Sequence, residues 1–193
     1  MLKQIRAAFV MLLVMTALTG LAYPLAITGL SQALFSDQAH GSLIETDGQV
    51  VGSTLIAQQF TGPGYFHPRP SAAGTGYAAD NSGASNLAPS NAALVDAVVE
   101  RVRAARAGDA ANAAAVPADM VTASASGLDP HLSPAAAAWQ VERVAKARGA
   151  EPQAIATLVA ARTEDRQFGV LGEPRVNVLL LNMDLDRRWS GGR

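Results

Sequence analysis

The sequence predicts an α+β domain that follows a single N-terminal transmembrane helix. No charged residue occurs between Arg6 and Asp37, and the run 7–35 consists mainly of apolar residues. Since about 20 apolar helical residues cross a bilayer, this run is long enough to span one. In the remainder, 37–193, apolar residues recur at helical spacing in some segments and alternate in others, which favours a mixture of helices and strands.

The apolar run has two interpretations. Lys3 and Arg6 form a basic start that a membrane anchor shares with a cleaved secretory signal. The apolar pattern continues as far as Leu34, beyond the usual core of a signal, which favours a retained anchor over residues 7–35. Pro24 is expected to kink this helix or to lift a few residues into the interface.

The charges on either side of the anchor predict its orientation. Basic residues precede the span, whereas acidic residues follow it and no Lys or Arg occurs until Arg69. By the positive-inside rule, residues 1–6 are expected in the cytoplasm and the domain 37–193 outside the cell's inner (plasma) membrane.

Composition excludes several classes of function. A net charge of -1 and a pI near 6.3 give no basic surface for nucleic acid. The absence of cysteine excludes disulfides, thiolate nucleophiles and thiolate metal sites. His40, His67 and His131 have none of the spacings typical of metal ligands, so no metal site is expected.

The domain is expected to begin with a hairpin. Asp47-Gly48 favours a tight turn between two short arms, 43–45 and 49–51. The next segment, 55–60, fits either a short helix or a short strand.

Residues 61–91 differ in character from the rest. Gly, Ser, Asn and Pro are dense there, and Leu87 is the one large aliphatic residue. A segment of this composition is expected to form a long loop that buries little and is either functional or disordered.

Helices are expected to dominate the second half. Ser90 is placed to cap a helix that ends near Gly108, and Ser133-Pro134 is a strong start signal for a helix 134–148 that stops at Gly149. A third helix is expected over 152–162. Alternating apolar residues over 175–181 favour a strand.

Ser126, Asp129 and His131 have the residue types of a hydrolase triad. They lie within six residues of one another, however, and no Gly-x-Ser-x-Gly elbow surrounds a serine. A turn that leads into the Ser133 cap is the favoured interpretation, and no catalytic residue is assigned. A membrane-anchored extracytoplasmic hydrolase that uses Ser126 or another loop serine is the alternative.

Two aromatic segments are candidates for partner contacts. Tyr65, Phe66 and Arg69 fit an interface anchor, because aromatic residues and arginine carry most hot-spot energy. Equally, Tyr65 and Phe66 could fold back as a lid on the helices. Arg143 lies one turn beyond Trp139, and a simple stacking of the two side chains is the favoured interpretation.

Six motifs occur in order along the chain. They are Gly52-Ser53-x-Leu55-Ile56-x-Gln58-x-Phe60, Tyr65-Phe66-x-x-Arg69-Pro70-Ser71, Ser82-Gly83-x-Ser85-Asn86-Leu87, Thr122-x-Ser124-x-Ser126-Gly127-Leu128-Asp129-Pro130, Gln140-Val141-x-Arg143-Val144-Ala145 and Arg175-Val176-Asn177-Val178-Leu179. With the anchor ahead of them, they resemble the KdpC family, the C subunit of the Kdp potassium-transporting ATPase, over nearly the whole chain. Ala57 stands where the family commonly has Gly.

The resemblance implies an accessory, non-catalytic subunit. Its partners would be the potassium-conducting A subunit, the ATPase B subunit, the small F subunit and the lipid bilayer. The implied roles are assembly of the complex and action as a catalytic chaperone that raises the affinity of the ATPase subunit for ATP. Residues expected at the partner surface are Tyr65, Phe66, Arg69, Ser71, Asn86 and Arg143.

The resemblance also implies candidate nucleotide contacts, at Gln140, Ser126 and Gly127, although no tightly bound cofactor is expected. ATP lies on the cytoplasmic side of the membrane, whereas the domain is expected outside. An effect on ATP affinity would therefore pass through the membrane spans as a coupling free energy. We rank assembly first, remote modulation second and direct ATP binding third.

Overall fold

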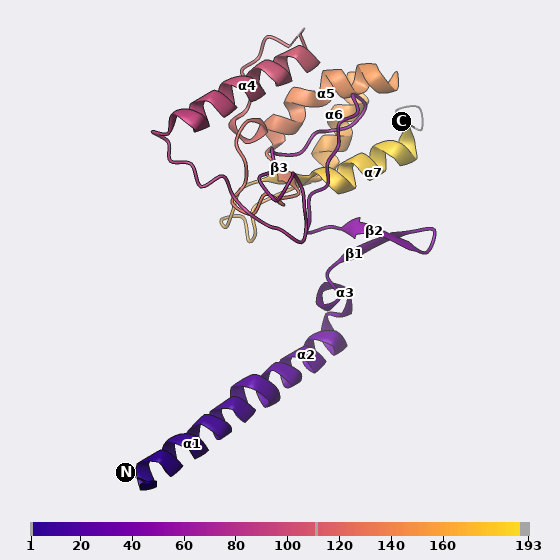
Figure 1. Ribbon diagram of the computed structural model, residues 1–193. Helices are drawn as coiled ribbons and strands as arrows, with labels where there is room; N and C mark the ends of the chain where they lie inside the picture. The colour runs from indigo at the N-terminus through magenta and orange to yellow at the C-terminus, as the bar shows by residue number, and fades with distance from the viewer. Residues whose placement is uncertain (1, 111, 190–193) are drawn as a thin grey trace. The chain divides into compact units, whose positions relative to one another are not determined.

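The computed structural model describes residues 2–110 and 112–189. The chain divides into two compact units, one ending at Ser53 and one starting at Thr54 (Figure 1). Each unit is described by itself.

The first unit begins with one long apolar helix. It consists of α1 (Leu2–Thr16), a π-helical segment η1 (Ala17–Ala22) and α2 (Tyr23–Leu34). Together they form a helix of 33 residues in which no residue is buried. Its most apolar window of 18 residues has a mean hydropathy of 2.0. At 1.5 Å per residue the helix is about 50 Å long, so by length and composition it can cross a membrane.

Pro24 changes the hydrogen bonding of this helix without ending it. The wide π turn immediately precedes Pro24, and the Tyr23 amide donates to the Leu18 carbonyl, five residues back. Pro24 itself occupies the first turn of α2, and the flanking residues keep helical dihedral angles. Since Pro has no N–H to donate, a π bulge before it accommodates the missing bond.

A short helix and a hairpin complete the first unit. α3 (Ser36–Ala39) is followed by β1 (Leu43–Thr46) and β2 (Gln49–Ser53), which pair antiparallel. Asp47 and Gly48 turn the chain with φ angles of 52° and 75°. These positive angles are those of the tight hairpin turn that the Asp-Gly dipeptide predicts, so the hairpin is confirmed.

The second unit has an α+β fold, as expected. A small antiparallel sheet has the order β3 (His131–Leu132), β5 (Arg175–Asn177) and β4 (Thr163–Glu164). The helices around it are α4 (Ala92–Gly108), η2 (Ala118–Met120), α5 (Pro134–Arg148), α6 (Pro152–Ala161) and α7 (Val178–Arg188).

The core lies among α5, α6, α7 and the strand β5. α5 starts and stops where the sequence predicts: the Ser133 hydroxyl accepts from the Ala136 amide at 3.1 Å, and Gly149 ends the helix in a left-handed conformation. α6 buries Ile155, Leu158 and Val159, as expected.

Three expectations about secondary structure are wrong. Residues 55–60 form neither helix nor strand. Asn91, not Ser90, caps α4 by accepting from the Ala93 amide. The strand at Arg175 ends at Asn177, whose side-chain oxygen accepts from the Leu180 amide and so starts α7. A capping side chain there overrides the short alternation of apolar residues.

The loop 61–91 contains no helix or strand, as expected, but it buries more than expected. Phe66 and Ala73 are both fully buried, and Phe66 belongs to the core cluster of the helices. An irregular backbone inside a core needs hydrogen-bond partners, because each unpaired buried amide or carbonyl costs stability. Side chains of α5 and α7 supply them.

Candidate functional site

Two amide side chains hold the loop against the helices at Phe66 and His67. On α5, Gln140 accepts from the His67 amide at 2.8 Å and donates to the His67 carbonyl at 3.1 Å. On α7, Asn182 accepts from the Phe66 amide and donates to the Phe66 carbonyl, both at 2.9 Å. These two amides thus replace a neighbouring strand for two consecutive loop residues.

Gln140 has no exposed surface. Its oxygen also accepts from Arg143 at 2.6 Å, and its nitrogen also donates to the Ala136 carbonyl at 3.4 Å. An amide offers two donors and two acceptor sites, so every one is used within the protein. A nucleotide contact at Gln140 stays a prediction that this geometry does not support, because the ligand would have to break bonds to His67 or Arg143.

Two arginines of α5 bind the loop just before Phe66. Arg143 donates to the carbonyls of Pro63 at 2.6 Å and of Tyr65 at 3.0 Å. Arg148 donates to the Gly64 carbonyl and is paired with Asp186 at 2.8 Å. Arg143 is therefore committed to the loop backbone, not to the stacking on Trp139 that the spacing suggested.

The aromatic pair folds inward. Arg148 lies 4.7 Å from the centre of the Tyr65 ring, and the Tyr65 hydroxyl donates to Asp186 at 3.0 Å. Phe66 is fully buried in the core. The expectation that Phe66 contacts a partner directly is corrected, since its whole surface is used within this chain; the lid alternative describes the pair.

A second junction joins the loop to the segment 123–131. The Ser71 hydroxyl donates to the Gly127 carbonyl at 2.6 Å. The Gly83 amide and the Ser82 hydroxyl both donate to the Ser126 carbonyl at 2.9 Å. Side chains and backbone of the loop thus bond to two consecutive carbonyls of the other segment.

Gly127 is required at this junction. Its φ is 67°, and a Cβ there would lie 2.6 Å from the Ala73 nitrogen and 2.7 Å from the Gly83 oxygen. Both atoms belong to backbone and cannot rotate away, so only glycine permits this close approach.

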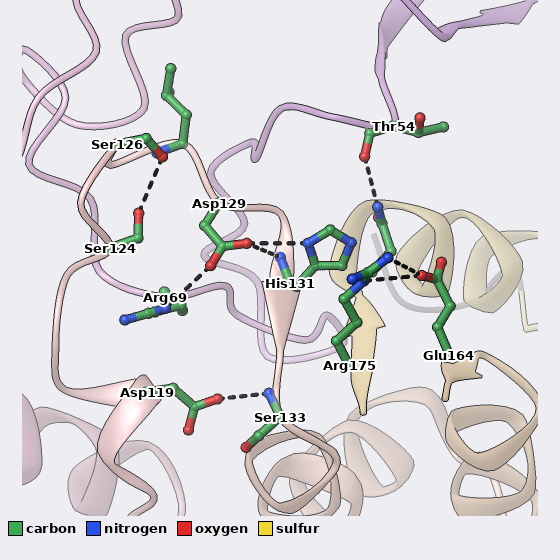
Figure 2. Close-up of polar contacts among 12 residues, drawn as sticks. Thr54, Arg69, Asp119, Ser124, Ser126, Asp129, His131, Ser133, Glu164 and Arg175 are labelled. Atoms are coloured by element: carbon green, nitrogen blue, oxygen red, sulfur yellow. Dashed lines mark hydrogen bonds and ion pairs between the residues drawn. The ribbon is translucent and has the colours of Figure 1, made fainter. Parts of the chain in front are cut away.

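Asp129 connects the two segments by charge (Figure 2). One of its oxygens is 3.2 Å from Arg69, and the other accepts from the His131 amide at 3.0 Å and lies 3.2 Å from the His131 ring. Burial alone raises the pKa of Asp129, but the hydrogen bonds from His131 and the charge of Arg69 outweigh burial and hold that pKa below its ordinary value. Asp129 is therefore ionised at neutral pH.

Tyr77 fixes the backbone at Arg69. Its hydroxyl donates to the Arg69 carbonyl at 2.7 Å, and its amide donates to the Ser71 hydroxyl at 2.8 Å. Burial raises the pKa of Tyr77 to about 12, so the hydroxyl keeps its proton and remains a donor.

The serine of the candidate triad is not joined to the histidine. The Ser126 hydroxyl accepts from the Leu128 amide at 3.1 Å and lies 3.5 Å from the Ser124 hydroxyl. Figure 2 shows both serines on the side of Asp129 away from His131. Asp129 and His131 are bonded to each other, within the turn that leads to Ser133.

The residues predicted for the partner surface differ in exposure. Tyr65, Arg69, Ser71 and Arg143 are half-buried and bonded within the domain, whereas Asn86 is exposed. Within residues 2–110 and 112–189, no three His, Cys, Asp or Glu side chains gather as a metal site would need.

Asn182, Arg148 and Asp186 were not singled out from the sequence. Asn182 lies on the same helix face as the buried Val178 and Leu185. A polar residue on an apolar stripe is a usable signal, because a buried amide needs hydrogen-bond partners.

Comparison with known proteins gives the family. The family model described as KdpC, the c chain of K+-transporting ATPases, matches residues 5–187. The chain belongs to the KdpC family. A potassium-transporting ATPase KdpC subunit of Rhodospirillum rubrum is 61% identical over 189 residues, 98% of each chain. KdpC subunits of Koribacter versatilis and Sorangium cellulosum are 54% and 57% identical and are covered to 95% and 98%.

Membership in the KdpC family agrees with the architecture. One N-terminal helix is apolar and long enough to cross a membrane, and a mixed helical and sheet unit follows it. Together these features fit a membrane-anchored subunit of a K+-transporting ATPase.

Proposed function

We propose that the chain is an accessory subunit that assembles and stabilises a potassium-transporting ATPase. Its expected partners are the potassium-conducting A subunit, the ATPase B subunit and the small F subunit. The basic residues before the span favour a cytoplasmic N-terminus and a domain outside the inner membrane.

The observation that carries this proposal is the fixed loop 61–91. Gln140 and Asn182 bind its backbone on one side, while Arg69 and Asp129 join it to the segment 123–131 on the other. A loop held in one conformation before binding loses less entropy when a partner docks on it. A protein-binding role therefore accounts for the amount of polar bonding devoted to this loop.

We propose that Arg69, Ser71 and Arg143 support partner binding by shaping this loop, while the exposed Asn86 contacts the partner. Arg69 is paired with Asp129, Ser71 is bonded to Gly127, and Arg143 is bonded to two carbonyls. Changes at these three positions would act by loosening the surface.

A second role, raising the ATP affinity of the ATPase subunit, is compatible with assembly. We propose that it operates at a distance, through contacts that favour one state of the complex. Direct ATP contact has less support, because Gln140 is buried and fully bonded. The hydrolase alternative also has less support, because the Ser126 hydroxyl is bonded to the Leu128 amide and Figure 2 shows it on the side of Asp129 away from His131.

The test compares membranes from cells that lack this chain with membranes from the same cells in which the chain is restored. The readouts are recovery of the complex and potassium-stimulated ATP hydrolysis. We expect the other subunits to be recovered separately without the chain, and potassium-stimulated ATP hydrolysis to return with it. If the complex assembles normally without the chain but needs more ATP for half-maximal hydrolysis, modulation is the main role. If neither assembly nor ATP dependence changes, the proposal is wrong.

A further inference from the structure

The connection between β4 and β5 ends in an exposed apolar tip, residues 166–173. Phe168 is 92% exposed, Val170 72% and Leu171 57%. Of the exposed large apolar side chains described after Thr54, no others lie this close together in the sequence. Clustered apolar exposure of this kind marks an interaction site more often than scattered single residues do.

The tip is held in one shape by its own backbone. The Gln167 amide donates to the Leu171 carbonyl and the Leu171 amide to the Gln167 carbonyl, both at 2.9 Å. The Gly169 amide also donates to the Arg166 carbonyl at 3.0 Å. A fourth bond runs from the Val170 amide to the Gln167 carbonyl at 3.2 Å. These four backbone hydrogen bonds fix the shape of the tip locally, while its apolar side chains stay exposed.

Phe168 occupies an unfavourable conformation. Its φ is 53°, a left-handed angle that is unfavourable for a residue with a side chain. At 92% exposure, the ring recovers little of that cost by packing within the described residues. Contact with another molecule would recover it, because a buried aromatic ring contributes strongly at an interface.

The charges beside the tip are neutralised within it. Arg166 pairs with Glu173 at 2.6 Å, and Arg175 pairs with Glu164 at 2.9 Å across the strands below. Asp165 adds a further negative charge, so the hairpin 164–175 carries two basic and three acidic residues. The chain has 15 basic and 16 acidic residues, and only two of them, both basic, precede the apolar run. The part after the run therefore carries a net charge of -3.

This balance of charge favours a protein over a bilayer as the occupant. Anionic membrane surfaces attract unpaired Lys and Arg, and neither is offered here. An apolar centre with paired charges at its rim is instead the usual composition of a protein interface.

We propose that Phe168, Val170 and Leu171 insert as a preformed apolar knob into an apolar pocket on another protein subunit of the ATPase. This inference rests on the proposed function, because it requires the chain to work within a complex. It adds a contact site outside the loop 61–91.

The variant Phe168→Asn, Val170→Thr tests the knob. Asparagine tolerates a left-handed φ and threonine has the shape of valine, so the hairpin should keep its fold. The matched control is Val95→Thr, at an apolar position of α4 that is 53% exposed. Each full-length chain is purified from native membranes in mild detergent, and thermal melting of each chain checks its fold.

We expect the double variant to melt like the unaltered chain and to recover at least tenfold less of the other subunits, while the control recovers normal amounts. Equal recovery by the double variant would overturn the knob and leave the proposed function intact. If the unaltered chain brings no ATPase subunit with it, both fail.

A photo-crosslinking residue at position 168, in cells, identifies the occupant directly. Adducts with a protein subunit of the ATPase support the knob. Adducts with lipid alone, or yields no higher than those from a crosslinker at position 95, would overturn it.

Discussion

Gln140 on α5 and Asn182 on α7 bind the backbones of two adjacent loop residues, His67 and Phe66. Each amide accepts from the N–H and donates to the C=O of its residue. The pair fixes a segment without helix or strand inside the core, as a strand would be fixed by its neighbour. The shape of the loop 61–91 thus depends on two side chains that are far apart in the sequence.

Asn182→Leu should destabilise the domain by roughly 2–4 kcal/mol, because it leaves a buried amide and a buried carbonyl of Phe66 unpaired. Chemical denaturation of the full chain measures this loss. The control is Gln153→Leu, at an exposed position of α6, where we expect a change below about 0.5 kcal/mol. Equal effects at the two positions would show that Asn182 does not hold the loop.

Gly127→Ala should lower the free energy of unfolding by at least ~2 kcal/mol. The loss comes from the left-handed backbone angle and from the clash of the new methyl group with Ala73 and Gly83. Gly149→Ala is the matched control. Gly149 has a similar φ of 61° but nothing within 4 Å of the new methyl group, so about 1 kcal/mol is expected. Thermal melting compares them, and a Gly149 effect as large as that at Gly127 would contradict the close approach.

His67 should make the domain less stable in mild acid. Burial first, and then the charge of Arg143, lower the pKa of His67 below its ordinary value of 6.5, although the bond to the Gly62 carbonyl opposes them. Below pH 6.5 the unfolded chain therefore binds a proton that the folded chain does not, and stability falls as pH falls toward the folded pKa.

The measurement is the free energy of unfolding against pH, between pH 5 and pH 7. We expect the free energy of unfolding to rise with pH, with a slope smaller than the limit for one proton, which is about 1.4 kcal/mol per pH unit. His67→Gln should flatten it, whereas His40→Gln, at an exposed position, should not. An unchanged slope in His67→Gln would assign the effect to other groups.

The absence of cysteine allows a clean test of orientation. A single cysteine at the exposed position Ser85 should react with a membrane-impermeant thiol reagent in intact cells stripped of any outer membrane. A cysteine in place of Gln4, before the span, should react only after the membrane is opened. The reverse pattern would place the domain in the cytoplasm and restore the possibility of direct ATP contact.

Local signals made much of the fold predictable. The Asp47-Gly48 turn, the Ser133-Pro134 start of α5 and the apolar spacing of α6 each depend on neighbouring residues, and each is confirmed. The end of β5 was missed because the Asn177 cap competes with an alternation only a few residues long.

The site was less predictable, because it depends on contacts between distant segments. The motif around Gln140 marks this residue as important. It does not show that the Gln140 amide binds the backbone of His67, 73 residues away. Likewise, the composition of 61–91 gave no sign that Phe66 belongs to the core, since its burial depends on Asn182 from α7.

Purification of the full chain from native membranes in mild detergent, with mass spectrometry of what accompanies it, tests the assembly role most directly. We predict that the potassium-conducting and ATPase subunits co-elute with it in a constant ratio and that the mixture hydrolyses ATP in response to potassium. Recovery of the chain alone, with an enzymatic activity that persists when the domain is released from its anchor, would contradict the assembly role and support the hydrolase.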